Sequence, residues 1–433
     1  MKSIISIFFF LVSPFLPINS FALETIEILG GKASMIPIAV TPFHEQTSLT
    51  KNQTQKINQI IDSDLRRSGL FDPLNVVGVG SYPREAMEVN YSNWSAMQAQ
   101  FLILGKIEAD DIDKNKIKVT WSLVDIFKQN IVMTSTLSGT LSQYRAIAHN
   151  ISDTVYEKLT GTPGVFHTKI AFVKKISNAE YALTISDFDG FNQKAIVKTN
   201  KSIISPRWSP DGKKIAYVSF EKNKPVIYIQ NLETGKRILL ANFKGNNSAP
   251  AWSPDSKKLA IVLTYSANSQ LYIINEDGSD IRQLMRTYSI NTEPAWAPNG
   301  DEIYFVSDRG GNGQIYKVNI NNNEVKRVTY EGKNNLSPSI SPDGKLLLFI
   351  SQKDGKYRVA LQNLLNNQYL TLTEGPQDES PLFAPNGHMV LFTYKDYGKT
   401  TKIGTVSING LMKTPINLGN GIVLESTWGP LKN

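Results

Sequence analysis

From Ile170 to the C-terminus, short apolar runs recur at a nearly constant spacing along the chain. Five of these runs follow a Pro-x-(Trp/Ile/Phe)-(Ser/Ala)-Pro-(Asp/Asn) motif. The motif begins at Pro206, Pro250, Pro294, Pro338 and Pro381, so its spacing is 44, 44, 44 and 43 residues. A period of about 40 to 50 residues built from strands and turns is typical of a β-propeller, in which each repeat forms one four-stranded blade.

The number of repeats predicts how the ring closes. The apolar strand recurs six times, starting at Ile170, Ile215, Leu259, Ile303, Leu347 and Val390. The Trp position also recurs six times but is offset, at Trp208, Trp252, Trp296, Ile340, Phe383 and Trp428. The first strand lacks a motif ahead of it, and the last motif lacks a strand after it. We therefore expect the C-terminal segment to pair beside the first propeller strand, which removes the unpaired edges of an open array.

Residues 23–162 do not repeat, and their mixed pattern predicts a small α/β domain ahead of an all-β six-bladed propeller over residues 163–433. Helical spacing of Ile57, Ile60, Ile61 and Leu65 predicts a helix from Lys51 to Leu70, with Thr50 as its cap and Gly69 at its stop. The other predicted elements are strands over 35–42 and 101–107, a hairpin of 116–127 with 130–137, and a closing helix over 144–159. Gly161 to Gly164 mark the boundary between the two domains.

The N-terminus has the pattern of a secretory signal over residues 1–22. Lys2 precedes an apolar stretch, and Ser20-Phe21-Ala22 supplies small residues for cleavage between Ala22 and Leu23. A membrane anchor is the competing interpretation, but Pro14 and Pro17 keep the apolar run below the roughly 20 residues of a spanning helix. Residues 23–33 end in two glycines and predict a mobile arm, with an edge strand of the domain as the alternative.

Composition excludes several classes of function. The chain has no cysteine, which rules out thiolate chemistry and zinc ribbons, and an exported protein with large cores does not require disulfides. The formal charge is +8, but no block of five like charges occurs, so we expect a solvated surface and no nucleic-acid site.

Motifs for catalysis, cofactors and metals are missing too. No Gly-x-Ser-x-Gly elbow is present, and Gly78-Val-Gly80 lacks the third glycine of a dinucleotide site. The histidines, which are His44, His149, His167 and His388, are scattered, and we interpret them as surface or packing residues. Asp-Gly turns such as Asp211-Gly212 are interpreted as hairpin turns, because the Asp-x-Asp-x-Asp-Gly loop that binds Ca²⁺ is absent. We predict no enzyme and no cofactor.

Together these features resemble the TolB family over the whole chain. The resemblance rests on the signal, on Ile36-Pro-Ile-Ala-Val-Thr-Pro-Phe43, on Asp64-Leu-Arg-Arg-Ser-Gly-Leu-Phe71 and on the Pro-x-Trp-Ser-Pro-Asp-Gly repeats. It implies a monomeric periplasmic protein of the Tol-Pal system that binds the Pal lipoprotein and TolA, with further outer-membrane proteins as candidate partners. The system supports outer-membrane integrity and the invagination of that membrane during division.

The resemblance also implies where each partner binds. Pal would dock around the channel mouth, through the loops just before the motif, at Asn246, Ala249, Asn291, Thr292, Glu293, Asn335, Asp378 and Glu379. TolA would bind the arm, at Leu23, Glu24, Ile26, Glu27 and Ile28. A rigid ring that carries many short polar loops suits protein recognition on physical grounds alone, although that argument names no partner. Ile340 and Phe383 depart from the repeat by replacing its Trp.

Two other functions are compatible with a secreted propeller. One is a hydrolase, which an activity screen would reveal and which the missing nucleophile motif argues against. The other is a scaffold for outer-membrane protein assembly, which copurified partners would distinguish from a Tol-Pal component.

Overall fold

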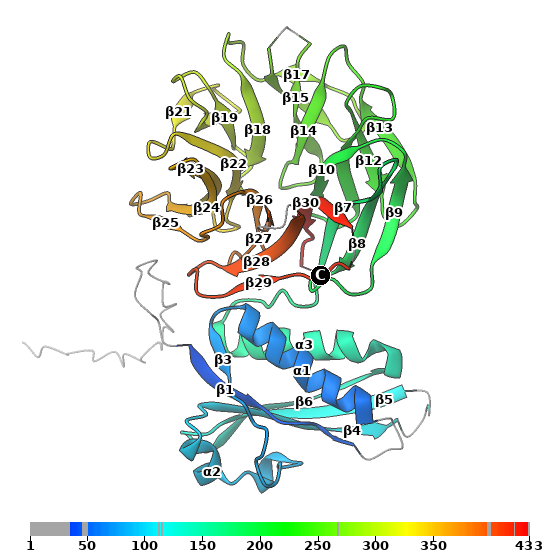
Figure 1. Ribbon diagram of the computed structural model, residues 1–433, viewed down its shortest axis with the longest axis vertical. Helices are drawn as coiled ribbons and strands as arrows, with labels where there is room; N and C mark the ends of the chain where they lie inside the picture. The colour runs from blue at the N-terminus through cyan, green and yellow to red at the C-terminus, as the bar shows by residue number, and fades with distance from the viewer. Residues whose placement is uncertain are drawn as a thin grey trace, which may run out of the picture.

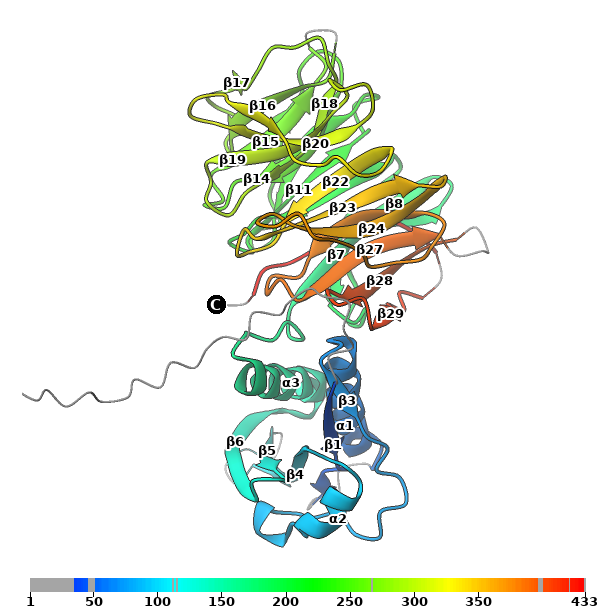
Figure 2. The ribbon, with the colours of Figure 1, turned by 90° about the vertical axis from the view of Figure 1, so that its left-hand side faces the viewer.

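A computed structural model describes residues 35–45, 51–110, 113, 116–265, 268–395, 400–419 and 421–431. The predicted signal, its cleavage site at Ala22 and Leu23, the arm and the Thr50 cap lie outside the described residues. The described chain forms a smaller N-terminal unit and a ring of strands, stacked along the long axis of the molecule (Figure 1). Figure 2 shows the two units from the side, joined through the segment that follows helix α3.

The N-terminal unit is an α/β domain, as predicted. Its sheet has the order β3-β1-β4-β5-β6, with β1 parallel to both β3 and β4, and with β2 paired to β4. Its elements are β1 (Ile36–Val40), β2 (His44–Glu45), α1 (Lys51–Arg67), β3 (Phe71–Pro73), η1 (Ala86–Glu88), α2 (Tyr91–Ala96), β4 (Phe101–Ala109), β5 (Lys116–Asp125), β6 (Asn130–Thr140), η2 (Leu141–Gln143) and α3 (Tyr144–Thr160).

Helices α1 and α3 pack side by side between this sheet and the ring (Figure 1). The predicted stripe of α1 is largely confirmed, because Ile57, Ile61 and Leu65 are buried, while Ile60 is half-buried. Gly69 follows α1 with a φ of +70°, the left-handed conformation with which many helices end.

The ring is a propeller of six four-stranded sheets, which confirms the predicted fold. In order from the innermost strand outward, five blades are β10 (Ile203–Trp208), β11 (Lys214–Ser219), β12 (Val226–Asn231) and β13 (Arg237–Ala241); β14 (Asn247–Trp252), β15 (Lys258–Leu263), β16 (Gln270–Asn275) and β17 (Arg282–Gln283); β18 (Asn291–Trp296), β19 (Glu302–Ser307), β20 (Gln314–Asn319) and β21 (Val325–Arg327); β22 (Asn334–Ile340), β23 (Leu346–Lys353), β24 (Lys356–Asn363) and β25 (Tyr369–Thr371); and β26 (Asp378–Phe383), β27 (Met389–Lys395), β28 (Thr401–Ser407) and β29 (Lys413–Pro415).

The sixth blade closes the ring as the sequence predicts. Its innermost strand is the C-terminal β30 (Ile422–Trp428), which pairs antiparallel with β7 (Lys169–Ser177), followed by β8 (Glu180–Asp187) and β9 (Lys194–Thr199). Trp428 lies opposite Ile170 in this pairing, and its indole N–H donates to the Thr168 hydroxyl at 2.7 Å. Blade closure therefore joins the two ends of the propeller sequence.

The Pro-x-Trp part of the repeated motif belongs to a strand and does not itself form a turn. In each blade that carries it, the motif ends the innermost strand, and the following Ser-Pro-Asp or Ala-Pro-Asn residues turn the chain. The indole N–H of Trp252 donates to the Arg207 carbonyl at 3.0 Å, and that of Trp296 donates to the Ala251 carbonyl at 3.1 Å. The Trp252 and Trp296 side chains thus link neighbouring blades, whereas the Trp208 indole N–H donates within its own blade, to the Gly212 carbonyl at 3.1 Å.

A bulge interrupts each of these strands just before the motif proline. The pairing register shifts there, and the residue ahead of the proline has a φ between 48° and 52°, at Ser205, Ala249, Glu293, Ser337 and Ser380. The residues predicted to lie in loops before the motif are therefore largely part of the innermost strands.

The two domains share one continuous apolar core, with residues of α1, α3, β7, β27 and β30 in the same cluster. Three polar contacts border it. The Tyr156 hydroxyl lies 2.9 Å from His388 Nδ1, Asn386 Nδ2 donates to the Pro163 carbonyl at 3.0 Å, and Asn409 Nδ2 donates to the Gly69 carbonyl at 3.2 Å. For His388 the predicted packing role agrees with this position.

Candidate functional site

The innermost strands surround the central channel, and all six start at the same face of the ring. The loops that lead into them form the mouth of the channel at that face. Of the predicted Pal-face residues, Asn246 is exposed in the loop ahead of β14, while Ala249, Thr292, Glu293 and Glu379 are half-buried within β14, β18 and β26. These five residues are accessible from the channel mouth, so the structure brings them onto one surface.

Three predicted contact residues are fully buried, so their side chains offer no surface to a partner in this structure. Asn291, Asn335 and Asp378 have no exposed surface, because each occupies the same position two residues ahead of the bulge. At that position the side chain points into the blade and holds the loop that leads into the strand.

The hydrogen bonds of Asn291 illustrate this role. Its Nδ2 donates to the Thr287 hydroxyl at 2.8 Å and to the Ser289 carbonyl at 3.2 Å, and its Oδ1 accepts from Arg309 Nη2 at 2.9 Å. The equivalent Asn335 Nδ2 donates to the Glu331 carbonyl at 2.6 Å. A buried polar group that is bonded in this way positions the mouth loops without facing a partner.

Charged side chains of four innermost strands lie close enough to affect one another: Arg207 of β10, Glu293 of β18, Glu379 of β26 and Glu425 of β30. Glu293 Oε2 accepts from the Ser337 backbone N–H at 2.6 Å, and Glu425 Oε2 accepts from the Ser205 backbone N–H at 2.8 Å. Each of these carboxylates therefore binds the bulge of the next blade. Burial raises the pKa of Glu425, although nearby Arg207 lowers it.

Arg207 is the cation of this group. Burial lowers its pKa, against the attraction of Glu425 and Glu293. Its Nη1 donates to the carbonyl of the adjacent Pro206 at 2.9 Å, and among the described residues no carboxylate lies within 4 Å of it. Its guanidinium therefore makes no ion pair among the described residues. The sequence analysis missed Arg207 and Glu425, since only ring closure brings their strands together.

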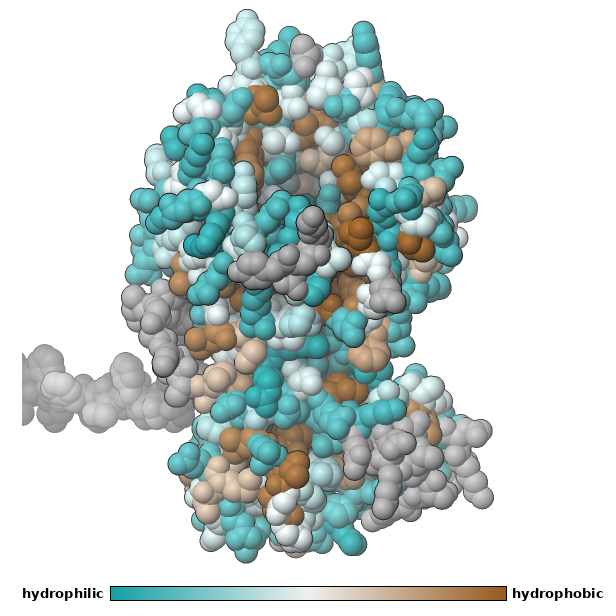
Figure 3. All heavy atoms as spheres, viewed as in Figure 1, coloured by the Kyte–Doolittle hydropathy of each residue, from teal (hydrophilic) through white to brown (hydrophobic). Residues whose placement is uncertain are grey.

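An exposed aromatic rim lies beside the mouth and was not predicted either. Tyr288 is fully exposed, Tyr330 is 71% exposed, and Tyr265 and Ile290 are also exposed, all in loops at the mouth face. Figure 3 shows apolar side chains around the hollow centre of the ring on the face toward the viewer. Aromatic side chains on otherwise polar loops are typical anchors of protein interfaces. For Tyr288, Ile290 and Tyr330, the available sequence signal was their place in the loops between blades, whereas Tyr265 lies in a loop within one blade.

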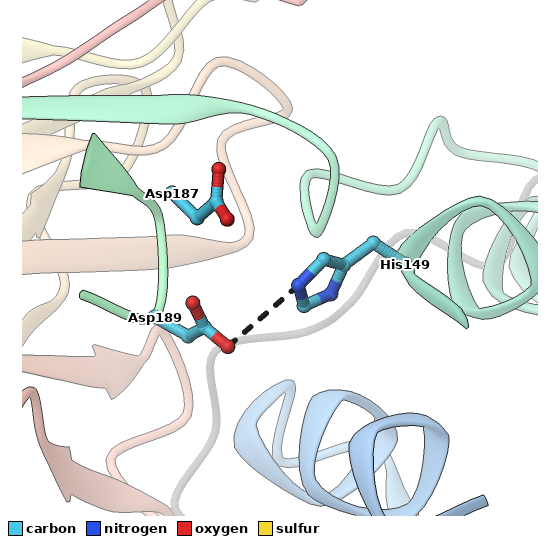
Figure 4. Close-up of side chains that lie close together, drawn as sticks. All are labelled: His149, Asp187 and Asp189. Carbon is cyan, nitrogen blue, oxygen red and sulfur yellow. Dashed lines mark ion pairs between the residues drawn. The ribbon is translucent and has the colours of Figure 1, made fainter. Parts of the chain in front are cut away.

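A second group of charges lies between the domains, where His149, Asp187 and Asp189 offer ligand atoms within 4.8 Å of one another (Figure 4). We assign no metal to it, because Arg145 already pairs with Asp189 and Lys169 with Asp187. For His149, the interpretation as a surface or packing residue is incomplete, since its ring belongs to a buried ion network.

Comparison with known proteins places these features in a family. The model described as the TolB beta propeller domain matches residues 156–432, and the model described as the TolB amino-terminal domain matches residues 24–132. The chain is 59% identical over 407 residues to a Tol-Pal system protein TolB of Methylobacillus flagellatus, covering 94% of this chain and 93% of that relative. It is 44% identical to the TolB of Nitrosomonas europaea over 231 residues, covering 53% and 52% of the two chains.

A solved structure agrees with this match over the same length. The crystal structure of TolB from Acinetobacter baumannii superposes with a TM-score of 0.84 at 33% identity, covering 92% of this chain and 97% of that one. The family fits the prediction of a protein without enzymatic activity. Both domains, their order and nearly the full length are shared, so the chain belongs to the TolB family of Tol-Pal system proteins.

Proposed function

We propose that this chain is a periplasmic protein-interaction component of the Tol-Pal system, with a role in outer-membrane integrity and in invagination during division. In this proposal residues 1–22 are the export signal, 23–162 form the N-terminal domain with its arm, and 163–433 form the propeller. Pal binds at the channel mouth and TolA binds the arm. Among the described helices, none has the length and apolar character needed to cross a bilayer.

The observation that supports Pal binding most directly is the make-up of the mouth. Half-buried polar residues on rigid innermost strands lie next to exposed Tyr288 and Tyr330 on loops. Buried Asn291 holds one of these loops in place, because it hydrogen-bonds Thr287 within the loop and Arg309 of the loop between β19 and β20. A surface that is held in place before binding loses little conformational entropy when a partner docks.

The test substitutes the accessible pair at the mouth. Thr292→Tyr with Glu293→Lys should weaken Pal binding by at least about tenfold, or about 1.4 kcal/mol. The bulky ring and the reversed charge both alter the mouth surface, although loss of the bond from Glu293 to Ser337 also affects the next strand. Isothermal titration calorimetry with purified Pal measures the change.

A matched control uses the same pair of residue types on the other face of the ring. Glu233→Lys with Thr234→Tyr changes two exposed residues in the turn between β12 and β13. This control should bind Pal like the unchanged chain. Equal weakening in both variants, or no weakening in the Thr292 and Glu293 variant while its circular dichroism is unaltered, would contradict binding at the mouth.

A further inference from the structure

A buried group of charged side chains joins the two domains, and the mouth does not involve it. Asp64 comes from α1, Arg145 and His149 come from α3, and Asp187 and Asp189 come from the end of β8 and the turn after it. The exposed fractions of the side chains are 1% for Asp64, 2% for His149 and 7% for Asp189. Figure 4 shows the imidazole directed from α3 toward the propeller turn.

The imidazole of His149 lies between the two domains. Its Nδ1 is 2.7 Å from Asp64 Oδ2 in the N-terminal domain, and its Nε2 is 3.6 Å from Asp189 Oδ2 in the propeller. Arg145 Nη2 is 3.5 Å from the same Nε2 and also pairs with Asp189. When both ring nitrogens carry protons, His149 can therefore donate a hydrogen bond to Asp64 and form an ion pair with Asp189.

The charges of this group balance only when His149 is protonated. The carboxylates of Asp64, Asp187 and Asp189 face two permanent cations, Arg145 and Lys169, and Lys169 pairs with Asp187. The third positive charge is that of the imidazolium. A buried carboxylate without a compensating charge is costly, so loss of this proton weakens the contact of the turn with α3.

The other charged groups near the imidazole of His149 do not supply this third positive charge. Arg67 of α1 lies over the Phe188 ring at 5.4 Å and makes no ion pair among the described residues. Asp153 of α3 accepts the backbone N–H of Phe166 and His167 at 2.7 and 3.0 Å, in the segment that joins the domains. Burial raises the pKa of Asp153 to about 7, although these two hydrogen bonds oppose it.

The surroundings of His149 favour its protonated form, and a cavity lies beside it. Burial alone lowers the pKa of His149, but the carboxylates of Asp64 and Asp189 outweigh it, so the pKa is raised above its ordinary value. A cavity of about 150 Å³, lined by His149, His167 and Lys169 among others, borders the group. A cavity of this size with polar side chains in its lining has room for water beside the imidazole.

We propose that His149 is a proton-controlled clamp between the domains: the imidazolium binds Asp64 of α1 and Asp189 of the propeller turn together, and loss of its proton loosens the docking of the propeller on α3. Because the pKa is raised in the docked state, the stabilisation is fully present below the ordinary value near 6.5 and is lost as the pH rises through the raised value. Within that window the ratio of tightly to loosely docked molecules falls by up to about tenfold per pH unit.

Distance measurements between the domains test the clamp. The chain has no cysteine, so Ser95→Cys on α2 and Lys356→Cys on β24, both exposed, give one spin-label pair across the domains. Double electron–electron resonance should give one narrow distribution of label-to-label distances at pH 6. A second, broader distribution should grow as the pH is raised to 9. A distribution that does not change over this range would overturn the proposal.

Variants assign the transition to His149. His149→Gln should make the distribution independent of pH, while His44→Gln, a histidine change in β2 away from the propeller, should keep the transition. Asp153→Asn removes the other titrating group and should keep the transition above pH 7. Loss of the response in Asp153→Asn, or its survival in His149→Gln, would show that His149 is not the clamp.

A second variant covers the case in which His149→Gln does not fold. Asp189→Asn removes the propeller carboxylate that the imidazolium binds, so the broad distance population should already be present at pH 6, and the midpoint of the imidazole titration should move to lower pH. Proton NMR of the imidazole resonances follows the same titration independently. An unchanged midpoint in Asp189→Asn would overturn the proposal.

Discussion

At the residue scale, backbone conformation decides which side chains reach the mouth. Glu293 adopts a φ of 51° one residue ahead of its proline, and the bulge there breaks the alternation of a regular strand. Thr292 and Glu293 are consequently both half-buried, whereas Asn291 is fully buried. Left-handed backbone at a non-glycine residue is strained and tends to occur at functional sites, which agrees with its recurrence around the mouth.

A glycine pair tests how backbone conformation and domain packing combine. Gly69 and Gly161 both follow a helix with φ near +70°, but a Cβ on Gly69 would lie 2.6 Å from the Ser407 hydroxyl, whereas nothing lies within 4 Å of one on Gly161. Gly161→Ala should therefore cost about 1–2 kcal/mol of unfolding free energy, and Gly69→Ala clearly more, because the propeller must also move. Denaturant titrations measure the unfolding free energy of both variants. Equal decreases would mean that Ser407 moves away from the added methyl group at no cost.

At the element scale, strand β30 matters most because it pairs the C-terminal end of the propeller sequence with its first strand. It pairs with β7 along its length and contributes Trp428, which is 7% exposed, to the core that both domains share. A strand at this place converts an open array with two edges into a closed ring.

Removal of residues 425–433 should therefore lower the melting temperature strongly. Loss of the Trp428 side chain alone should cost about 3–5 kcal/mol, since it is buried and its indole is bonded to Thr168. Calorimetric melts of the full and shortened chains measure this, and a chain that lacks only Lys432 and Asn433 is the control. If the shortened chain melted like the control, closure by β30 would not be a major source of stability.

At the scale of the whole molecule, the proposal assigns two partners to two separate regions, the mouth of the ring and the N-terminal arm. Deletion of residues 23–32 should abolish TolA binding and spare the primary Pal contacts, whereas the Thr292 and Glu293 variant should show the reverse. If Pal binding alters the docking of the arm, each partner must change the affinity of the other by the same factor.

Calorimetry of both variants with both partners checks this assignment. The Glu233 and Thr234 variant is the control for the mouth, and circular dichroism verifies that each variant folds. Equal loss of both partners in each variant would show that a single shared surface binds them.

The sequence by itself determined the number of blades, the closure by the C-terminal strand and most elements of the N-terminal domain. These features depend on local periodicity and on repeated turn residues, which the chain carries in order. The bulge was not visible in this way, because the motif proline and its neighbours are compatible with either a loop or a bulged strand. The sequence therefore predicts accessible loop residues at Asn291, Asn335 and Asp378, which the bulged strands bury.

Only the tertiary structure decided which distant residues share an environment. Arg207 and Glu425 approach each other because the ring closes, and Asp64, His149 and Asp189 meet because α1, α3 and the propeller turn pack together. In the chain these residues are separated by many others and carry no common motif. Burial, and with it the charge balance around His149, is a property of the packed domains, so no pattern along the chain records it.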